Sequence, residues 1–354
     1  MKAIDYAKAS CDTMMRKFEA AKLPPAGRFH YHQGVFLSGM TETYKQCRDE
    51  RYFNYMRAWV DSLIDRDGNI LNFDRGQLDD IMPGVLLYPL LAGSGDVRYK
   101  KALDTLIGVL EEFPKNPLGG FWHKSYYPEQ MWLDGLYMAG PIMAEYAKRF
   151  DKPSLLDEVV AQILLMEEVT RDSATGLWCH AFDYTKSMPW ANPETGKSPE
   201  FWGRAMGWVV VAVQQILNFM EETHPMYERV RRAARDLLIA LTKYQTESGL
   251  WCQVVDKADD PRNWTEVSCS CLFTAGLFMA VRSGILPDEY LKYARRGYEG
   301  VIDTLKWNGE DLIVGKVCVG TGVGDLAHYY GRPTSENDLH GVGAFLIMCA
   351  ECGE

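Results

Sequence analysis

The sequence is short of several features that mark other classes of protein. Its 354 residues carry 38 basic against 48 acidic side chains, a formal net charge of −10, and no run of lysine and arginine. Because a protein that binds nucleic acid needs a basic stripe along the phosphates, this balance argues against such a partner. No stretch reaches the roughly 18 uncharged apolar residues of a membrane span. The sequence therefore predicts neither nucleic-acid binding nor membrane association.

Targeting and metal-binding patterns are also missing. The first 22 residues carry a charge every few positions and lack the apolar core of a signal peptide, so we expect a cytoplasmic protein. The nine cysteines have no zinc-type spacing to histidines, and a single serine separates Cys269 from Cys271, which rules out a CxxC redox motif. We interpret them as reduced thiols of the core and predict no metal and no cofactor.

What the sequence does have is a repeat. Six times, a segment of glycine, aromatic and polar residues opens an apolar helix, which a loop joins to a more charged amphipathic helix. The apolar helices open at Tyr31, Leu78, Trp132, Phe201, Ser268 and Asn337. The amphipathic helices are predicted at residues 4–19, 51–64, 96–110, 152–169, 226–245 and 288–306.

Six such helical hairpins predict an all-α protein, with a tightly packed inner ring of apolar helices inside an outer ring of amphipathic ones. This architecture is the (α/α)6 barrel, or six-hairpin toroid. No linker rich in proline, glycine or serine interrupts the repeats, so we expect residues 1–354 to form one catalytic domain. An open helical solenoid is the alternative. It would not need aromatic and polar residues concentrated at one end of the inner helices.

Asp134 is the strongest candidate for a catalytic residue. Three apolar residues precede it in MWLDGLY, and Tyr137 stands where a capping box would need Glu or Gln. We therefore favour a functional role over helix capping. Apolar walls disfavour the charged form of a carboxylate, so we expect the pKa of Asp134 to be raised and the group to hold a proton near neutrality.

Asp79 and Asp80 open another inner helix at the equivalent position and supply the second carboxylate that acid/base chemistry on sugars usually needs. We expect Asp79 to face the cavity and Asp80 to serve the local structure.

Other candidates bind substrate. In FWGRAMGW, Trp202 and Trp208 offer flat rings to sugar faces, and Arg204 offers a planar fork to a carboxylate, as a uronic acid requires. The alternative places Trp208 in the core and pairs Arg204 with a structural acid. The candidates for hydrogen bonding to substrate are His123 and His180, in two equivalent glycine-aromatic loops, and Tyr31, which equally suits packing.

Taken together, the segments WLDGLYMAGP, FWGRAMGW and GTGVGD…YYGRPTSENDLHGVGAFL resemble the unsaturated rhamnogalacturonyl hydrolases, glycoside hydrolase family 105, over essentially the whole chain. The resemblance implies hydrolysis of a lyase-generated disaccharide or short oligosaccharide, with release of its non-reducing 4,5-unsaturated uronic acid. It makes Asp134 the general acid/base and Asp79 the second active-site aspartate, with Tyr31, His123, His180, Trp202, Arg204 and Trp208 around the sugar. Ala205 and Met206 depart from the Gly-Asn that relatives often carry, which bears on the sugar more than on the reaction.

Two other activities remain open at this stage. An unsaturated glucuronyl hydrolase acting on glycosaminoglycan or ulvan fragments would share the fold and the chemistry and differ in the leaving sugar. A sugar 2-epimerase would share the barrel, but it would rely on histidine acid/base pairs.

Overall fold

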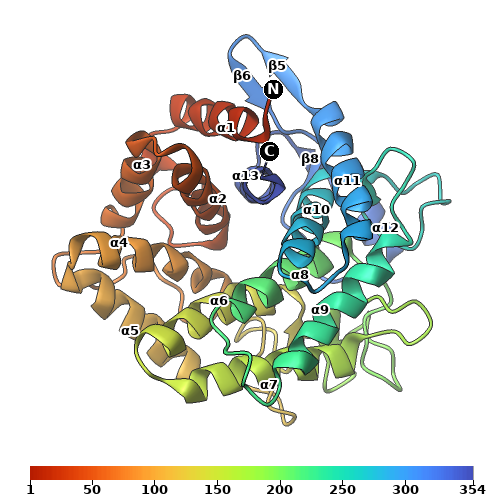
Figure 1. Cartoon of the computed structure of the whole chain (residues 1–354). Helices are drawn as coiled ribbons and strands as arrows, with labels where there is room; N and C mark the ends of the chain where they lie inside the picture. Colours follow the sequence, from red (N-terminus) through yellow and green to blue (C-terminus); the bar gives the residue numbers. More distant parts are fainter. Residues whose placement is uncertain (354) are drawn as a thin grey trace.

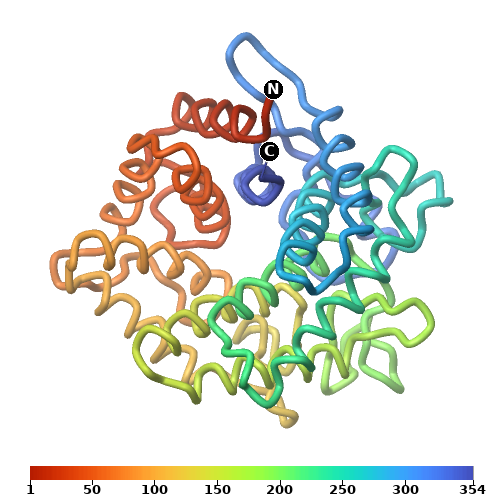
Figure 2. The backbone as a smooth tube through the Cα atoms, in the orientation of Figure 1, coloured from red at the N-terminus to blue at the C-terminus, as the bar shows by residue number. Residues whose placement is uncertain are grey.

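The computed structural model describes residues 1–353, and helices make up most of it. Figures 1 and 2 show these helices as two concentric rings around one axis. The inner ring consists of α2 (Tyr31–Cys47), α4 (Leu87–Ser94), α6 (Asp134–Arg149), α8 (Gly203–Leu217), α10 (Val267–Arg282) and α13 (Leu339–Cys352).

The outer ring alternates with the inner one along the chain. It consists of α1 (Ala3–Lys17), α3 (Glu50–Asp61), α5 (Val97–Glu111), α7 (Pro153–Thr170), α9 (Tyr227–Thr242) and α11 (Leu291–Thr304). Outer helices bury one stripe and expose the opposite face, whereas nearly every residue of α8 and α10 is buried. The predicted (α/α)6 barrel is therefore confirmed.

The ring closes where its first and last inner helices, α2 and α13, lie side by side (Figure 1). Glycines make this contact close. A Cβ atom on Gly343 of α13 would stand 2.5 Å from the carbonyl carbon of Val35 on α2, and one on Gly39 would stand 2.6 Å from Leu346 Cβ. Only glycine fits at such distances, and the two backbones touch.

One inner segment differs from its prediction. Instead of one helix from Leu78, the chain forms two short 3-10 turns, η2 (Leu78–Asp80) and η3 (Met82–Leu86), before α4 begins at Leu87. Pro83 lies at this point, and a proline cannot donate the backbone hydrogen bond that a helix interior requires. Asp79 and Asp80 consequently sit in a tight turn at the end of the barrel rather than on a regular helix.

Short antiparallel strand pairs and turns link the loops. The strand pairs are β1 (Gln130–Trp132) with β2 (Ala181–Asp183), β3 (Trp251–Cys252) with β4 (Thr265–Glu266), β5 (Lys306–Asn308) with β6 (Asp311–Ile313), and β7 (Val317–Cys318) with β8 (Thr334–Ser335). The remaining elements are the turns η1 (Ala20–Lys22) and η4 (Asp288–Tyr290) and the short helix α12 (Leu326–Tyr330).

The pairing of β1 with β2 positions the candidate site. It sets Trp132 opposite Ala181, so Asp134 and His180 meet although they come from different repeats. Within residues 1–353, none of the helices combines the length and apolar character that crossing a bilayer requires.

Candidate active site

Asp134 lies in the first turn of α6 with its carboxylate directed at a histidine. Leu133 occupies the N-cap position of this helix without a side-chain cap hydrogen bond, and the Asp134 side chain is 12% exposed. Its Oδ2 atom lies 3.2 Å from Nε2 of His180. Asp134 therefore contacts a titratable partner instead of capping its helix.

A buried tyrosine fixes the orientation of His180. The Tyr329 hydroxyl, from α12, lies 2.7 Å from His180 Nδ1 and accepts a hydrogen bond from the Gly324 amide at 3.3 Å. Burial raises the pKa of Tyr329, so this hydroxyl keeps its proton and donates it to Nδ1. His180 consequently carries its own hydrogen on Nε2 and donates it to Asp134. Tyr329 lies inside the C-terminal run that carried the family resemblance, but no spacing in the sequence links it to His180.

Asp79 has two basic partners. Its Oδ2 atom is 2.6 Å from Lys124 Nζ, and its Oδ1 atom is 3.4 Å from His123 Nε2. His123 in turn stacks on Trp132, with ring centroids 4.5 Å apart. Burial acts to raise the pKa of Asp79, but His123 and Lys124 outweigh it and leave this pKa lowered. The sequence analysis had not identified Lys124.

Asp80 is completely buried and serves as a local hydrogen-bond acceptor. It receives the Asp74 amide at 3.0 Å, lies 2.6 Å from His30 Nδ1 and forms an ion pair with Arg28 at 3.4 Å. These contacts hold the turn together, whereas Asp79 reaches the side chains around Asp134.

The expected pKa of Asp134 was wrong in direction. Burial acts to raise the pKa, as does the nearby charge of Asp79. The hydrogen bond and the charge of His180, assisted by His123, outweigh both and hold the pKa of Asp134 below its ordinary value. The sequence showed the apolar neighbours in the chain but not the histidine that folding brings into contact. In the free protein, Asp134 is ionised near neutral pH.

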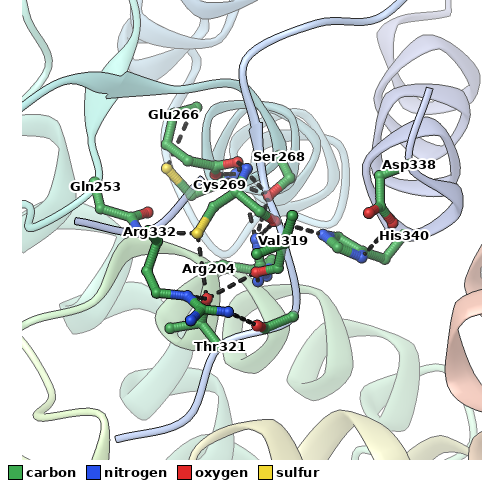
Figure 3. Close-up of polar contacts among 12 residues, drawn as sticks. Arg204, Gln253, Glu266, Ser268, Cys269, Val319, Thr321, Arg332, Asp338 and His340 are labelled. Atoms are coloured by element: carbon green, nitrogen blue, oxygen red, sulfur yellow. Dashed lines mark hydrogen bonds and ion pairs between the residues drawn. The ribbon is translucent and has the colours of Figure 1, made fainter. Parts of the chain in front are cut away.

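Arg204 is buried at the start of α8, and its fork is already occupied (Figure 3). Nη1 donates to the carbonyl of Cys318 at 2.6 Å, Nη2 donates to the carbonyl of Val319 at 2.8 Å, and Glu266 lies 3.9 Å away. The guanidinium thus anchors the loop that follows β7. It still interacts electrostatically with Tyr31 and Asp134, so its positive charge reaches the site.

Neither predicted tryptophan presents an open face, since Trp202 and Trp208 are each 1% exposed. The Cζ atom of Arg204 lies over the Trp202 ring, 4.5 Å from the ring centroid. The ring centroids of Trp202 and His180 are 4.6 Å apart. Trp208 packs on Tyr137 at 4.7 Å, deeper in the barrel. The expectation that Trp208 stacks on sugar was wrong. Trp208 lies more than one turn after the start of α8 at Gly203, and its ring is buried in the core.

Aromatic rings surround these groups at the end of the barrel. Tyr31, the first residue of α2, is partly exposed and interacts electrostatically with Asp79 and Asp134. Trp132 stacks between Tyr127 and His123, with centroid distances of 5.1 and 4.5 Å. Two carboxylates, two histidines and aromatic walls thus meet at one end of the inner ring.

The model of Glycosyl Hydrolase Family 88 matches residues 6–354 of the sequence. The chain belongs to this family. The protein is therefore a glycoside hydrolase.

Two relatives of this family 88 chain span almost its whole length. The unsaturated rhamnogalacturonyl hydrolase YesR of Bacillus subtilis is 29% identical over 324 residues, which are 90% of this chain and 88% of YesR. A solved structure of a family 105 glycoside hydrolase from C. acetobutylicum is 31% identical, with a TM-score of 0.94 and 98% of both chains covered. The resemblance to family 105 is confirmed.

A more distant solved structure shares the fold alone. The unsaturated glucuronyl hydrolase of Bacillus sp. GL1 superposes with a TM-score of 0.73 over 98% of this chain and 95% of its own, at 16% identity.

Proposed function

We propose that this protein is an unsaturated rhamnogalacturonyl hydrolase. It removes the 4,5-unsaturated uronic acid from the non-reducing end of disaccharides and short oligosaccharides left by a polysaccharide lyase, a step of pectin degradation. The observation that carries the proposal is the pair of buried aspartates, Asp134 on His180 and Asp79 on Lys124, in a chain related over nine tenths of its length to such a hydrolase.

The reaction is hydration of a vinyl ether. Protonated Asp134 gives its proton to C4 of the double bond, and water adds to C5 as the carboxylate takes one proton from it. The product is a hemiketal at C5, which opens spontaneously and breaks the bond to the neighbouring sugar. The anomeric carbon is not attacked, so the separation of the carboxylates does not set the stereochemistry as it does in ordinary glycosidases.

Asp134 must be protonated for the first step, although it is ionised in the free protein. The substrate itself supplies the reason for the change. A uronate carboxylate brings a negative charge into the buried site, where like charges raise the pKa of a nearby carboxyl group. Asp134 then binds a proton together with the substrate.

Positive charge near the uronate comes from Arg204, whereas burial lowers the pKa of His123 and His180, so these rings act as neutral hydrogen-bonding groups. Arg204 acts through the electric field of its charge, because its Nη1 and Nη2 atoms already donate to the carbonyl oxygens of Cys318 and Val319. Trp202 supports Arg204 and His180, and Tyr31 contacts the sugar with its hydroxyl.

The test is an absorbance assay with unsaturated disaccharides, whose enol chromophore disappears on hydration. Rhamnose-linked and hexosamine-linked substrates are compared under the same conditions, and we expect faster loss with the rhamnose-linked one. Faster loss with the hexosamine-linked substrate would instead indicate an unsaturated glucuronyl hydrolase. No loss with any uronate disaccharide, from a protein with a helical circular dichroism spectrum, would refute the hydrolase proposal.

A further inference from the structure

Three metal-ligating side chains meet at the closure of the barrel, outside the proposed chemistry. His32 lies in the first turn of α2, His340 lies in the first turn of α13, and Asp338 immediately precedes α13. One donor atom from each of them lies within 4.8 Å of the other two. His340 Nδ1 is 2.8 Å and His32 Nε2 is 4.0 Å from the same oxygen, Oδ1 of Asp338.

The hydrogen bonding of His340 leaves a lone pair facing Asp338. Its Nε2 lies 3.0 Å from the carbonyl oxygen of Cys318. Because a carbonyl oxygen only accepts, Nε2 carries the hydrogen, and Nδ1 of the neutral ring is an acceptor. The same carbonyl accepts from Arg204 Nη1 at 2.6 Å, so a positive charge on His340 would face the guanidinium. An imidazole nitrogen and a carboxylate oxygen thus face each other, and a cation can join them.

In the described part of the chain, each histidine of this cluster has one buried ring nitrogen without a hydrogen-bond partner, although in His32 this is not the Nε2 atom that faces Asp338. Within residues 1–353, the Nδ1 atoms of His340 and His32 are buried without a hydrogen-bond partner. Oδ1 of Asp338 lies 2.8 Å from His340 Nδ1, and with the ring hydrogen on Nε2 these two atoms are both acceptors. Buried nitrogens without partners are costly unless a ligand binds them.

We propose that His32, Asp338 and His340 bind one divalent transition-metal ion of the Zn²⁺ class. Two imidazole nitrogens and one carboxylate oxygen are a donor set that Zn²⁺ uses, with a fourth position left for water. The hydrogen bond from His340 Nε2 to a backbone carbonyl is the usual support of a histidine ligand. The sequence predicted no metal, because these ligands come from opposite ends of the chain and form no local motif.

The ion ties α2 to α13 where the ring closes. The glycine contacts between these helices begin about one turn further along, where a Cβ atom on Gly343 would meet the backbone of Val35 and Phe36 at 2.5 to 2.7 Å. Backbones held so close leave the donor atoms little freedom, so the site is prepared before the ion binds. The expected consequence is stabilisation of the folded chain, independent of the hydrolase reaction.

The experiment is a calorimetric titration of EDTA-treated, dialysed full-length protein with Zn²⁺, combined with thermal unfolding. We expect one ion per chain, and a Tm at least about 2 °C higher at a hundredfold excess over Kd. His32→Gln and Asp338→Asn should each weaken binding at least tenfold and remove the shift in Tm. His340 is fully buried, so His340→Gln is informative only alongside these two less buried positions.

Two controls exclude other sites. His224→Gln removes a surface histidine that lies 3.2 Å from Asp157 and should leave Zn²⁺ binding unchanged. A Cys47→Ser, Cys352→Ser double variant removes the partly exposed thiols and should also bind one ion. Absence of stoichiometric binding, or binding unchanged by both His32→Gln and Asp338→Asn, would overturn the proposal. Because binding and Tm are read without substrate, failure here and failure of the hydrolase proposal are distinguishable.

Discussion

At the scale of the residue, the candidate site depends on contacts between repeats. Asp134 belongs to the third hairpin, His180 to the loop before the fourth, and Tyr329 to the C-terminal loop. The sequence identified the first two as candidates because each stands in a repeated motif. It could not show that the histidine lowers the pKa of the aspartate, since that depends on a distance created by folding.

Tyr329→Phe should reveal the positioning role of Tyr329. Without the hydroxyl, the hydrogen of His180 can lie on either ring nitrogen. The hydrogen bond from His180 to Asp134 is then weaker, and the pKa of Asp134 rises. We expect the pH-independent kcat to fall about three- to tenfold, because the lost hydrogen bond no longer orients His180 and Asp134, with little change in KM. The alkaline limb of the pH–rate profile should move to higher pH. Tyr330→Phe is the control, since the neighbouring Tyr330 interacts with Asp260 and Arg262 and not with His180. An unshifted profile in Tyr329→Phe would argue against this role.

The ion pair of Asp79 predicts a pH dependence of stability. The pKa of Asp79 is lower in the folded than in the unfolded state, so its contribution is present above the unfolded value of about 4 and disappears as pH falls through the folded value. Urea unfolding between about pH 6 and pH 3 measures this effect. As the pH falls, the free energy of unfolding should decrease less steeply for Asp79→Asn than for the wild type. Asp259→Asn, at an exposed position, should match the wild type. Equal slopes in all three proteins would contradict the expected ion pair.

At the scale of the element, the sequence pattern predicted eleven of the twelve helices of the two rings with small errors at their ends. The outer helices were found because an apolar stripe at 3.6-residue spacing requires no knowledge of the partner. The prediction for the segment from Leu78 was wrong because it placed Pro83 inside one continuous helix, whereas this proline lies in the 3-10 turn η3 that precedes α4. The burial of Arg204 could not be predicted either, because the loop that it anchors follows more than a hundred residues later.

The closure between α2 and α13 should be intolerant of even one methyl group. Gly343→Ala would place Cβ 2.5 Å from the backbone of Val35, and we expect a loss of about 1–3 kcal/mol in the free energy of unfolding. In α5, the Cβ atom of Gly108→Ala would have no neighbouring atom within 4 Å. This substitution should therefore stabilise the protein by about 0.5–1 kcal/mol. Urea unfolding measures both. A Gly343→Ala protein as stable as the wild type would show that the helices separate easily.

At the scale of the whole molecule, the closed ring makes every hairpin depend on two neighbours. The last inner helix packs against the first, so neither end of the chain can leave without exposing apolar surface of the other. The single-domain prediction therefore implies cooperative unfolding. Scanning calorimetry should show one transition, coincident with the loss of helical circular dichroism. Two resolved transitions would indicate that the chain contains separable folding units.

The central claim is that Asp134 protonates the double bond of an unsaturated uronic acid. Its most direct test is the loss of enol absorbance from a rhamnose-linked unsaturated disaccharide, with Asp134→Asn beside the wild type. The account predicts loss with the wild type and a rate at least about a hundredfold lower with a variant that keeps its helical spectrum and Tm. A variant that hydrates the substrate at the wild-type rate would contradict it.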